Sequence, residues 1–298
     1  MAGIRIAASG QKSLAARRWT VSWAWIGLLP FLLFAFAFLL LPSATILVGS
    51  FQDAHGQFTL ENFSNLLTPT VVHAYSSSLQ LSLITAVTGG ILGFLIAYAI
   101  TLGGLPKLAQ TAVIAIAAVA SNFAGVPLAF AFVSILGRTG FLTSLLKAGG
   151  FNLYDHGFNL YSLAGLSLTY IYFLFPLMIM LLVSSLEGMK REWREAAENL
   201  GASSVQYWRN IGLPILLPAV LGTMILLFGS SFGAYATAYA LTGGQINLIT
   251  LQISSQLSGD VFNNPGAGYV MALGMVIIMA LSLGLYTVLQ RRTEKWLR

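Results

Sequence analysis

The sequence predicts an all-α membrane protein with six transmembrane helices and with both termini in the cytoplasm. Three observations support this prediction: the composition, six long apolar runs, and the placement of the basic residues. Only 8% of the 298 residues are charged, and the mean hydropathy is +0.80. Because a soluble domain carries roughly 25% charged residues, the composition excludes a chain of soluble domains.

Six uncharged apolar runs divide the chain. They cover residues 25–50, 78–102, 108–136, 160–186, 215–241 and 268–290. Each is long enough to cross a hydrocarbon core of ~30 Å as a helix, and a helix satisfies its own backbone where water is absent. The first run is longer than the apolar part of a cleaved signal peptide, about 7–15 residues, so we expect a retained helix there.

The domain organisation follows from these runs. Residues 1–23 form a polar, basic segment that we expect in the cytoplasm, and residues 24–298 form the transmembrane domain. Prolines inside or near the ends of the runs predict kinked helices. These prolines are Pro30, Pro127, Pro176 and Pro218.

Basic residues give the orientation, because cytoplasmic loops carry an excess of Lys and Arg. With the N-terminus inside, only Arg138 and Lys147 fall in outer segments. The other thirteen of the fifteen basic residues are then cytoplasmic: Arg5, Lys12, Arg17, Arg18, Lys107, Lys190, Arg191, Arg194, Arg209, Arg291, Arg292, Lys295 and Arg298. The basic excess therefore indicates cytoplasmic loops and not nucleic-acid binding.

The longest polar stretch, residues 187–214, lies between the fourth and fifth runs. Trp193, Ala196, Ala197 and Leu200 have helical spacing, which predicts an amphipathic helix. We expect Gly201 to end this helix in a left-handed conformation.

A second short helix is predicted directly after that glycine. Ser203 and Gln206 have the spacing of a capping box at its start. Pro214 is expected to stop it.

This stretch also has a family resemblance. Glu195-Ala196-Ala197 is followed by three residues and Gly201, then by nine residues and Ile211, then by one residue and Leu213-Pro214. The pattern resembles the EAA loop of ABC-transporter permeases, the inner-membrane components of type I binding-protein-dependent importers. The number of runs and the position of the loop are also similar to that family.

The resemblance implies the type I importer permease fold over residues 24–298, in a multi-pass protein of the bacterial inner membrane. In that family the EAA loop forms a coupling helix that sits in a groove of the ATP-binding subunit. The implied partners are two copies of an ABC ATP-binding subunit, a second permease that is homologous or identical, an extracytoplasmic solute-binding protein and membrane lipid. The implied coupling residues are Glu195, Ala196, Ala197, Gly201, Ile211, Leu213 and Pro214. The alternative is an amphipathic loop that lies on the inner leaflet.

Several kinds of chemistry are absent from the sequence. There is no Gly-Lys pair and hence no phosphate-binding P-loop, so we expect ATP hydrolysis on a partner and no enzyme activity here. The three His residues are scattered and there is no Cys, so we expect no metal site, and we expect no cofactor on this chain. The apolar runs contain no ionisable residue, which disfavours an ion-coupled carrier.

The solute path is predicted from polar and aromatic residues in the runs. The candidates are Asn122, Tyr170, Ser231, Tyr235 and Tyr239. Each could instead serve helix packing. We expect transport of a polyamine-like or another small organic solute. The alternative function is a non-transporting scaffold or channel-like protein that docks a cytoplasmic partner through residues 187–214.

Overall fold

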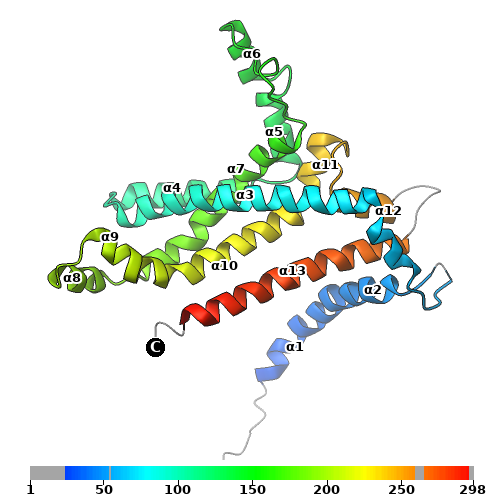
Figure 1. Cartoon of the computed structure of the whole chain (residues 1–298), viewed down its shortest axis with the longest axis horizontal. Coiled ribbons are helices and arrows are strands. Elements are labelled where there is room, and N and C mark those ends of the chain that lie inside the picture. The colour runs from blue at the N-terminus through cyan, green and yellow to red at the C-terminus, as the bar shows by residue number, and fades with distance from the viewer. Residues whose placement is uncertain (1–23, 54, 259–264, 295–298) are drawn as a thin grey trace, which may run out of the picture. The chain divides into compact units, whose positions relative to one another are not determined.

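The computed structural model describes residues 24–53, 55–258 and 265–294, and the predicted segment 1–23 lies outside them. Within the described residues the chain is helical, and its one β-bridge joins Gln52 to Phe58. Two compact units divide near Thr45 and Ile46. Figure 1 shows the helices with their labels.

The first unit holds most of one continuous helical run. It starts with α1 (Ala24–Ala35), passes through the π-helical turn η1 (Phe36–Leu40) and ends with α2 (Leu41–Ser50), which enters the second unit. Pro30 lies inside α1. The run Gly27–Ser50 is long and apolar enough to cross a membrane.

The second unit holds the other long helices. They are α3 (Pro69–Leu102), α7 (Leu163–Glu187), α10 (Leu213–Phe232) and α13 (Pro265–Glu294). Six helical runs in the described part of the chain are long and apolar enough to cross a membrane: Gly27–Ser50, Pro69–Leu102, Val126–Ala148, Leu163–Glu187, Ser204–Phe232 and Pro265–Val288. The predicted fold class, an all-α membrane protein with six spans, is confirmed.

Shorter helices lie between the long ones. They are η2 (Glu61–Leu67), α4 (Lys107–Asn122), α5 (Val126–Leu136), α6 (Phe141–Ala148), α8 (Arg191–Asn199), α9 (Ser204–Tyr207), η3 (Trp208–Gly212), α11 (Ala236–Thr242) and α12 (Ile249–Ser258). Where the sequence predicts single spans over 108–136 and 215–241, the structure has two helices each, α4 with α5 and α10 with α11. Hydropathy runs unbroken through both junctions, so it gave no sign of them.

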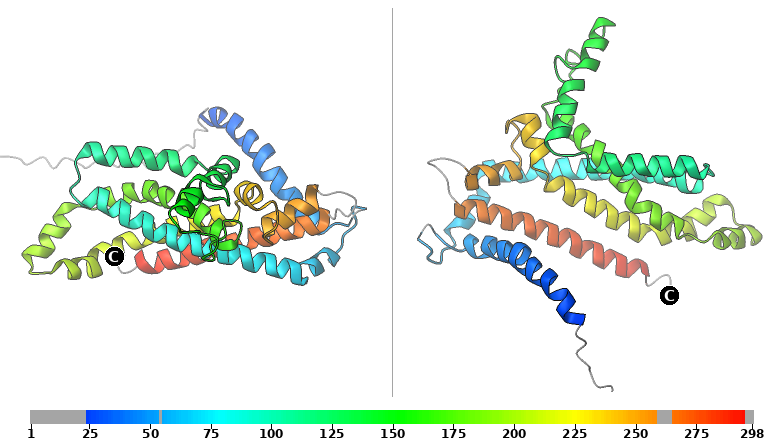
Figure 2. Two further views of the ribbon diagram at one scale, coloured as in Figure 1. Left: turned by 90° about the horizontal axis from the view of Figure 1, so that it is seen from above. Right: turned by 180° about the vertical axis from the view of Figure 1, so that it is seen from behind.

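Helix α7 is the centre of the second unit. It contacts α3, α4 and α10, and it is the most buried of the candidate spans (Figures 1 and 2). Leu174 and Met178 on α7 are fully buried against glycines of α3. A Cβ at Gly93 would lie 2.5 Å from both Met178 Cβ and the carbonyl oxygen of Phe175. The glycine therefore allows the two helix backbones to approach closely.

The short loop after α2 is held by a carboxylate. Asp53 accepts hydrogen bonds from the backbone N–H groups of Gln57, at 2.9 Å, and His55, at 2.8 Å. These bonds lower the pKa of Asp53, with the bond from Gln57 as the largest cause. The Asp53 carboxylate thus holds the backbone at His55 and Gln57.

The glycine contact predicts the effect of adding one methyl group to the α3–α7 seam. Gly93→Ala should destabilise the protein by about 1–3 kcal/mol, because the new Cβ overpacks against α7. Thermal unfolding in detergent should show a lower midpoint. Gly284→Ala is the matched control, since nothing lies within 4 Å of its Cβ position, and equal midpoints for the two variants would contradict the assignment.

Candidate functional site: a cytoplasmic loop and two paired helix breaks

The helix α8 ends in a Schellman motif. The Gly201 N–H donates to the Glu198 carbonyl at 2.9 Å, and the Ala202 N–H donates to the Ala197 carbonyl at 3.0 Å. Gly201 has φ of +78°, a conformation that a residue with a Cβ adopts only at a cost. The left-handed glycine predicted at this position is confirmed.

The predicted capping box is confirmed as well. The Ser203 side chain accepts from the Gln206 N–H, and the Gln206 side chain accepts from the Ser203 N–H. The expected stop at Pro214 is wrong, because Ser204–Phe232 is one helical run through α9, η3 and α10. Pro214 lies in the first turn of α10, where the preceding π-helical turn loosens the spacing that the proline ring would otherwise disturb.

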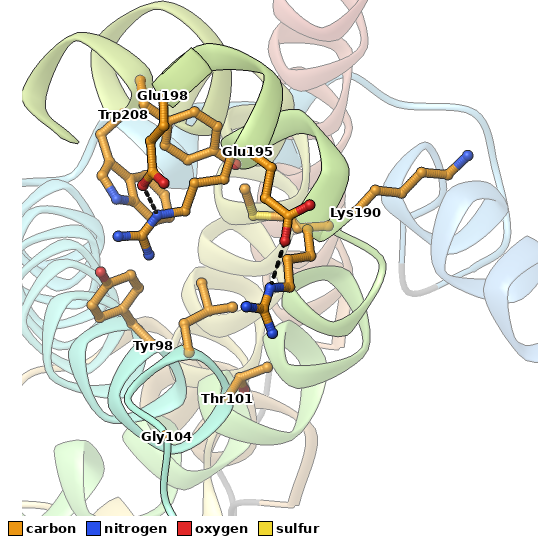
Figure 3. A pocket seen from close by; sticks show the side chains of 12 residues that line it. Tyr98, Thr101, Gly104, Lys190, Glu195, Glu198 and Trp208 are labelled. Carbon is orange, nitrogen blue, oxygen red and sulfur yellow. Dashed lines mark hydrogen bonds and ion pairs between the residues drawn. The ribbon is translucent and has the colours of Figure 1, made fainter. Parts of the chain in front are cut away.

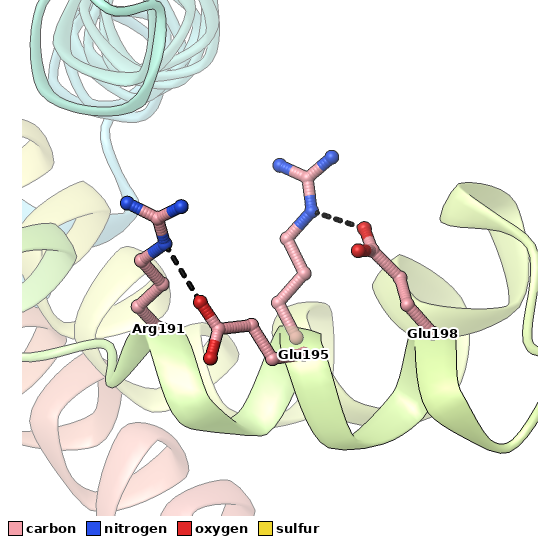
Figure 4. Close-up of polar contacts among 4 residues, drawn as sticks. Arg191, Glu195 and Glu198 are labelled. Carbon is pink, nitrogen blue, oxygen red and sulfur yellow. Dashed lines mark hydrogen bonds and ion pairs between the residues drawn. The ribbon is translucent and has the colours of Figure 1, made fainter.

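Two ion pairs lie along one side of α8 (Figure 4). Arg191 Nε contacts Glu195 Oε1, and Arg194 Nε contacts Glu198 Oε1, both at 2.9 Å. The bond to Glu198 is the largest cause that raises the pKa of Arg194. Because all four side chains are half exposed or more, these pairs add little to stability. They pair the four charges along one face of α8.

Some apolar residues of the loop face the protein and others face away from it. Ala197 is 5% exposed and faces the protein, whereas Leu200 is 89% exposed and Val205 is 75% exposed. Ala196 is exposed as well. The predicted stripe of α8 is therefore only partly covered by this chain, and two large apolar side chains flank Gly201 without a covering partner in the described residues.

A cavity of about 550 Å³ lies between α8 and the end of α3 (Figure 3). We call it the α8 cavity. Its lining residues are Tyr98, Thr101, Leu102, Gly104, Met189, Lys190, Arg191, Arg194, Glu195, Glu198, Tyr207 and Trp208. Of the predicted coupling residues only Glu195 lines this cavity. Ala196, Gly201 and Leu213 are exposed, and Ile211 and Pro214 are half-buried.

The two helix breaks lie against each other (Figure 1). Between α4 and α5, Gly125 has φ of +74°, and Pro127 sits in the first turn of α5. The Gly125 N–H donates to Thr237 Oγ1 of α11 at 2.9 Å. An interrupted helix at membrane depth needs such partners, because unsatisfied backbone groups are costly there.

At the break between α10 and α11, a backbone carbonyl group finds its hydrogen-bond partner on α7. The hydroxyl of Tyr170, a fully buried residue, donates to the Ala234 carbonyl at 2.8 Å. Tyr170, which is predicted for the solute path, makes this bond to the Ala234 carbonyl. Thr237 was absent from the predicted set, since no local pattern relates it to a glycine 112 residues away in the chain.

The predicted solute-path residues do not share one cavity. Tyr235 and Tyr239 stack with ring centroids 5.5 Å apart and line a cavity of about 380 Å³. Ser254 Oγ donates to the Tyr235 hydroxyl at 3.0 Å.

The other two candidates have their own partners. Ser231 is buried, and its hydroxyl bonds Thr85 of α3 at 2.8 Å. Asn122 is exposed, and its amide donates to the Ala118 carbonyl at 2.8 Å.

These features define a class: a multi-pass membrane protein of the permease type, with a polar loop between two of its spans. The chain belongs to the family of binding-protein-dependent transport system inner membrane components, whose pattern matches residues 13–295. Members of this family are the permease subunits of ABC importers, which are not ATPases. The chain is therefore an importer permease of the inner membrane.

Individual relatives support this membership. The chain is 28% identical to the probable sulfate transport system permease protein cysT of Nephroselmis olivacea, over 79% of this chain and 78% of that protein. It is 24% identical to the spermidine/putrescine transport system permease protein PotB of Haemophilus influenzae, over 86% and 92%. A chain of a bacterial ABC transporter involved in alginate import has a TM-score of 0.70 at 17% identity, over 90% and 95%. This last likeness shows the fold.

The paired breaks make a testable prediction. Thr237→Val removes the acceptor of the Gly125 N–H and should cost about 1–3 kcal/mol of stability, because a buried donor is left unpaired. Thermal unfolding of the purified protein measures the loss. Thr237→Ser keeps the oxygen and should stay close to the parent, so an equal loss in both variants would mean that the methyl contact and not the hydrogen bond matters.

Proposed function

We propose that this permease receives the energy of ATP hydrolysis through residues 187–214, by docking of α8 and the Gly201 turn on an ABC ATP-binding subunit. The observation that carries the proposal is the pair of exposed apolar side chains, Leu200 and Val205, on either side of that turn. Large apolar side chains that stay uncovered next to charged ones are typical of a protein interface. The EAA pattern lies on the same residues.

The local structure of the loop would let a movement of the Gly201 turn reach the membrane span. The Schellman motif at Gly201 and the capping box at Ser203 define the turn by hydrogen bonds on both sides. From Ser204 the helix continues into the membrane span as far as Phe232. Force applied at the turn would therefore act on a helix that reaches the break at Ala234.

The proposed assembly contains two ATP-binding subunits, a second permease and an extracytoplasmic solute-binding protein. The chain itself would take no cofactor and hydrolyse no ATP, since it contains no P-loop. The uncharged spans support the same division of labour, because no intramembrane ionisable group is available for ion coupling.

The proposed solute path runs past the paired breaks and the Tyr235–Tyr239 cavity. The side chains that line this cavity are aromatic, hydroxyl, amide or aliphatic, and none is charged. A polyamine-like or another small organic solute suits such a lining, since an amine binds the face of an aromatic ring. The named relatives are permeases of a probable sulfate transport system and of a spermidine/putrescine transport system, so a transport assay would include both classes of solute.

The turn provides the first test of coupling. Gly201→Val should reduce solute-stimulated ATPase activity and transport in the assembled complex, because a β-branched residue resists the left-handed conformation at a cost of about 1–2 kcal/mol or more. Gly201→Asn should retain much more activity, since Asn tolerates that conformation. No Cβ clash complicates the comparison, as nothing lies within 4 Å of the Cβ position. Full coupled activity in the Val variant would defeat the assignment.

The exposed side chains provide the second test. Leu200→Gln should weaken copurification of the ATP-binding subunit by about tenfold, the loss expected when a buried leucine leaves an apolar interface. Leu108→Gln is the matched control, because Leu108 is 83% exposed near the same predicted face but lies outside the loop. Equal retention of the ATPase by both variants would support an inner-leaflet or scaffold role for the loop.

A further inference from the structure

The α8 cavity has a charged wall. Three cationic side chains line it, Lys190, Arg191 and Arg194, together with two carboxylates, Glu195 and Glu198. The lining thus carries one more positive than negative group. Leu200 and Val205, the exposed apolar residues of the loop, are not among the lining residues. Of the predicted coupling residues, only Glu195 lines the cavity.

Each of the two guanidinium groups is paired with a carboxylate through its Nε atom only. Each carboxylate contacts the Nε atom of its arginine, and Figure 4 shows the terminal nitrogens of Arg191 directed away from α8. The edge formed by the two terminal nitrogens of a guanidinium fits two oxygens of a phosphate. Both arginines line the cavity, and their ion pairs leave the terminal nitrogens available to a phosphate.

The opposite wall has the character of a membrane interface. Tyr98 of α3 and Trp208 of η3 meet edge to face with centroids 5.2 Å apart. Tyr and Trp are enriched at the headgroup level of a bilayer, and Tyr98 lies one turn before the end of α3 at Leu102. The cavity thus lies at the predicted cytoplasmic end of the spans.

An apolar surface leads from this cavity toward the membrane. Leu102 lines the cavity, and Leu95 lies two turns earlier on the same face of α3, with both side chains exposed. An acyl chain could lie along this face while its headgroup occupied the cavity. A free anion would make no use of it.

We propose that the α8 cavity binds the phosphate of an anionic phospholipid from the inner leaflet. Arg191 and Arg194 would contact the phosphate oxygens, Lys190 would add charge at the rim, and Tyr98 and Trp208 would flank the headgroup. Because the bound headgroup would contact both α8 and the end of α3, it would set the position of the coupling helix. This site goes beyond ATPase docking and does not depend on it.

The test uses the full-length permease alone, reconstituted in phosphatidylcholine nanodiscs that contain phosphatidylglycerol. Native mass spectrometry measures the phosphatidylglycerol that each released permease retains. Arg191→Gln/Arg194→Gln should lower this retention by about tenfold or more, since each basic residue near the surface contributes about fivefold to binding of anionic lipid. Lys107→Gln/Arg209→Gln is the matched control, because it removes two predicted cytoplasmic charges that do not line the cavity.

Equal losses in the two double variants would overturn the proposal, because general surface charge would then explain the binding. Displacement of the lipid by millimolar inorganic phosphate, with no preference for the lipid, would identify a free-anion site and overturn the lipid assignment. If the Gln variant does not fold, Arg191→Lys/Arg194→Lys keeps the charge and removes the planar edges. This Lys variant should retain an intermediate amount of phosphatidylglycerol. Retention equal to that of the parent protein would contradict the proposed role of the planar guanidinium edges.

Discussion

The constraint on which the rest of this structure depends is that backbone groups in hydrocarbon must find partners within the protein. An uninterrupted helix satisfies this requirement with its own backbone hydrogen bonds. Two places in the second unit need such partners: the junction between α4 and α5 and the junction between α10 and α11. There the Gly125 N–H is bonded by Thr237, and the Ala234 carbonyl is bonded by Tyr170. The breaks are supported by side chains and are not defects.

The predicted spans contain no Asp, Glu, Lys, Arg or His, the residues that carry ions or sense voltage within a membrane. This composition favours the proposal that energy enters through the polar loop. The polar loop at 187–214 combines charged side chains with two uncovered apolar side chains, Leu200 and Val205. Its turn is defined by hydrogen bonds, and the helix that follows passes through a π-helical turn into the span. This continuity connects the cytoplasmic face mechanically to the break beside Tyr235.

Local signals in the sequence predicted local structure well. The left-handed Gly201 and the Ser203–Gln206 capping box depend on residues within a turn of each other, and both are confirmed. The prediction that Pro214 ends the helix was wrong because a π-helical turn precedes it and accommodates the proline ring. No residue pattern marks such a turn. The spans were recognised because hydropathy reports length and polarity.

Long-range partners were not predictable in this way. Hydropathy does not distinguish an intact span from two helices that meet at Gly125 or Ala234. Ser231 and Tyr170 were chosen as polar groups in apolar runs, yet their bonds to Thr85 and to the Ala234 carbonyl depend on helix packing. Thr237 acquires its role only when α11 lies beside α5. A single sequence contains no signal for these pairings.

The central claim is that the turn at Gly201 contacts an ATP-binding subunit. The chain has no cysteine, so Leu200→Cys places a single reactive thiol beside the turn, at a side chain that is 89% exposed. With a short photo-crosslinker on this thiol, illumination of the assembled complex should join the permease to the ATP-binding subunit, and the yield should change when ATP is bound. Crosslinks to lipid alone, or labelling of the thiol by an impermeant reagent from the outer face, would contradict the account.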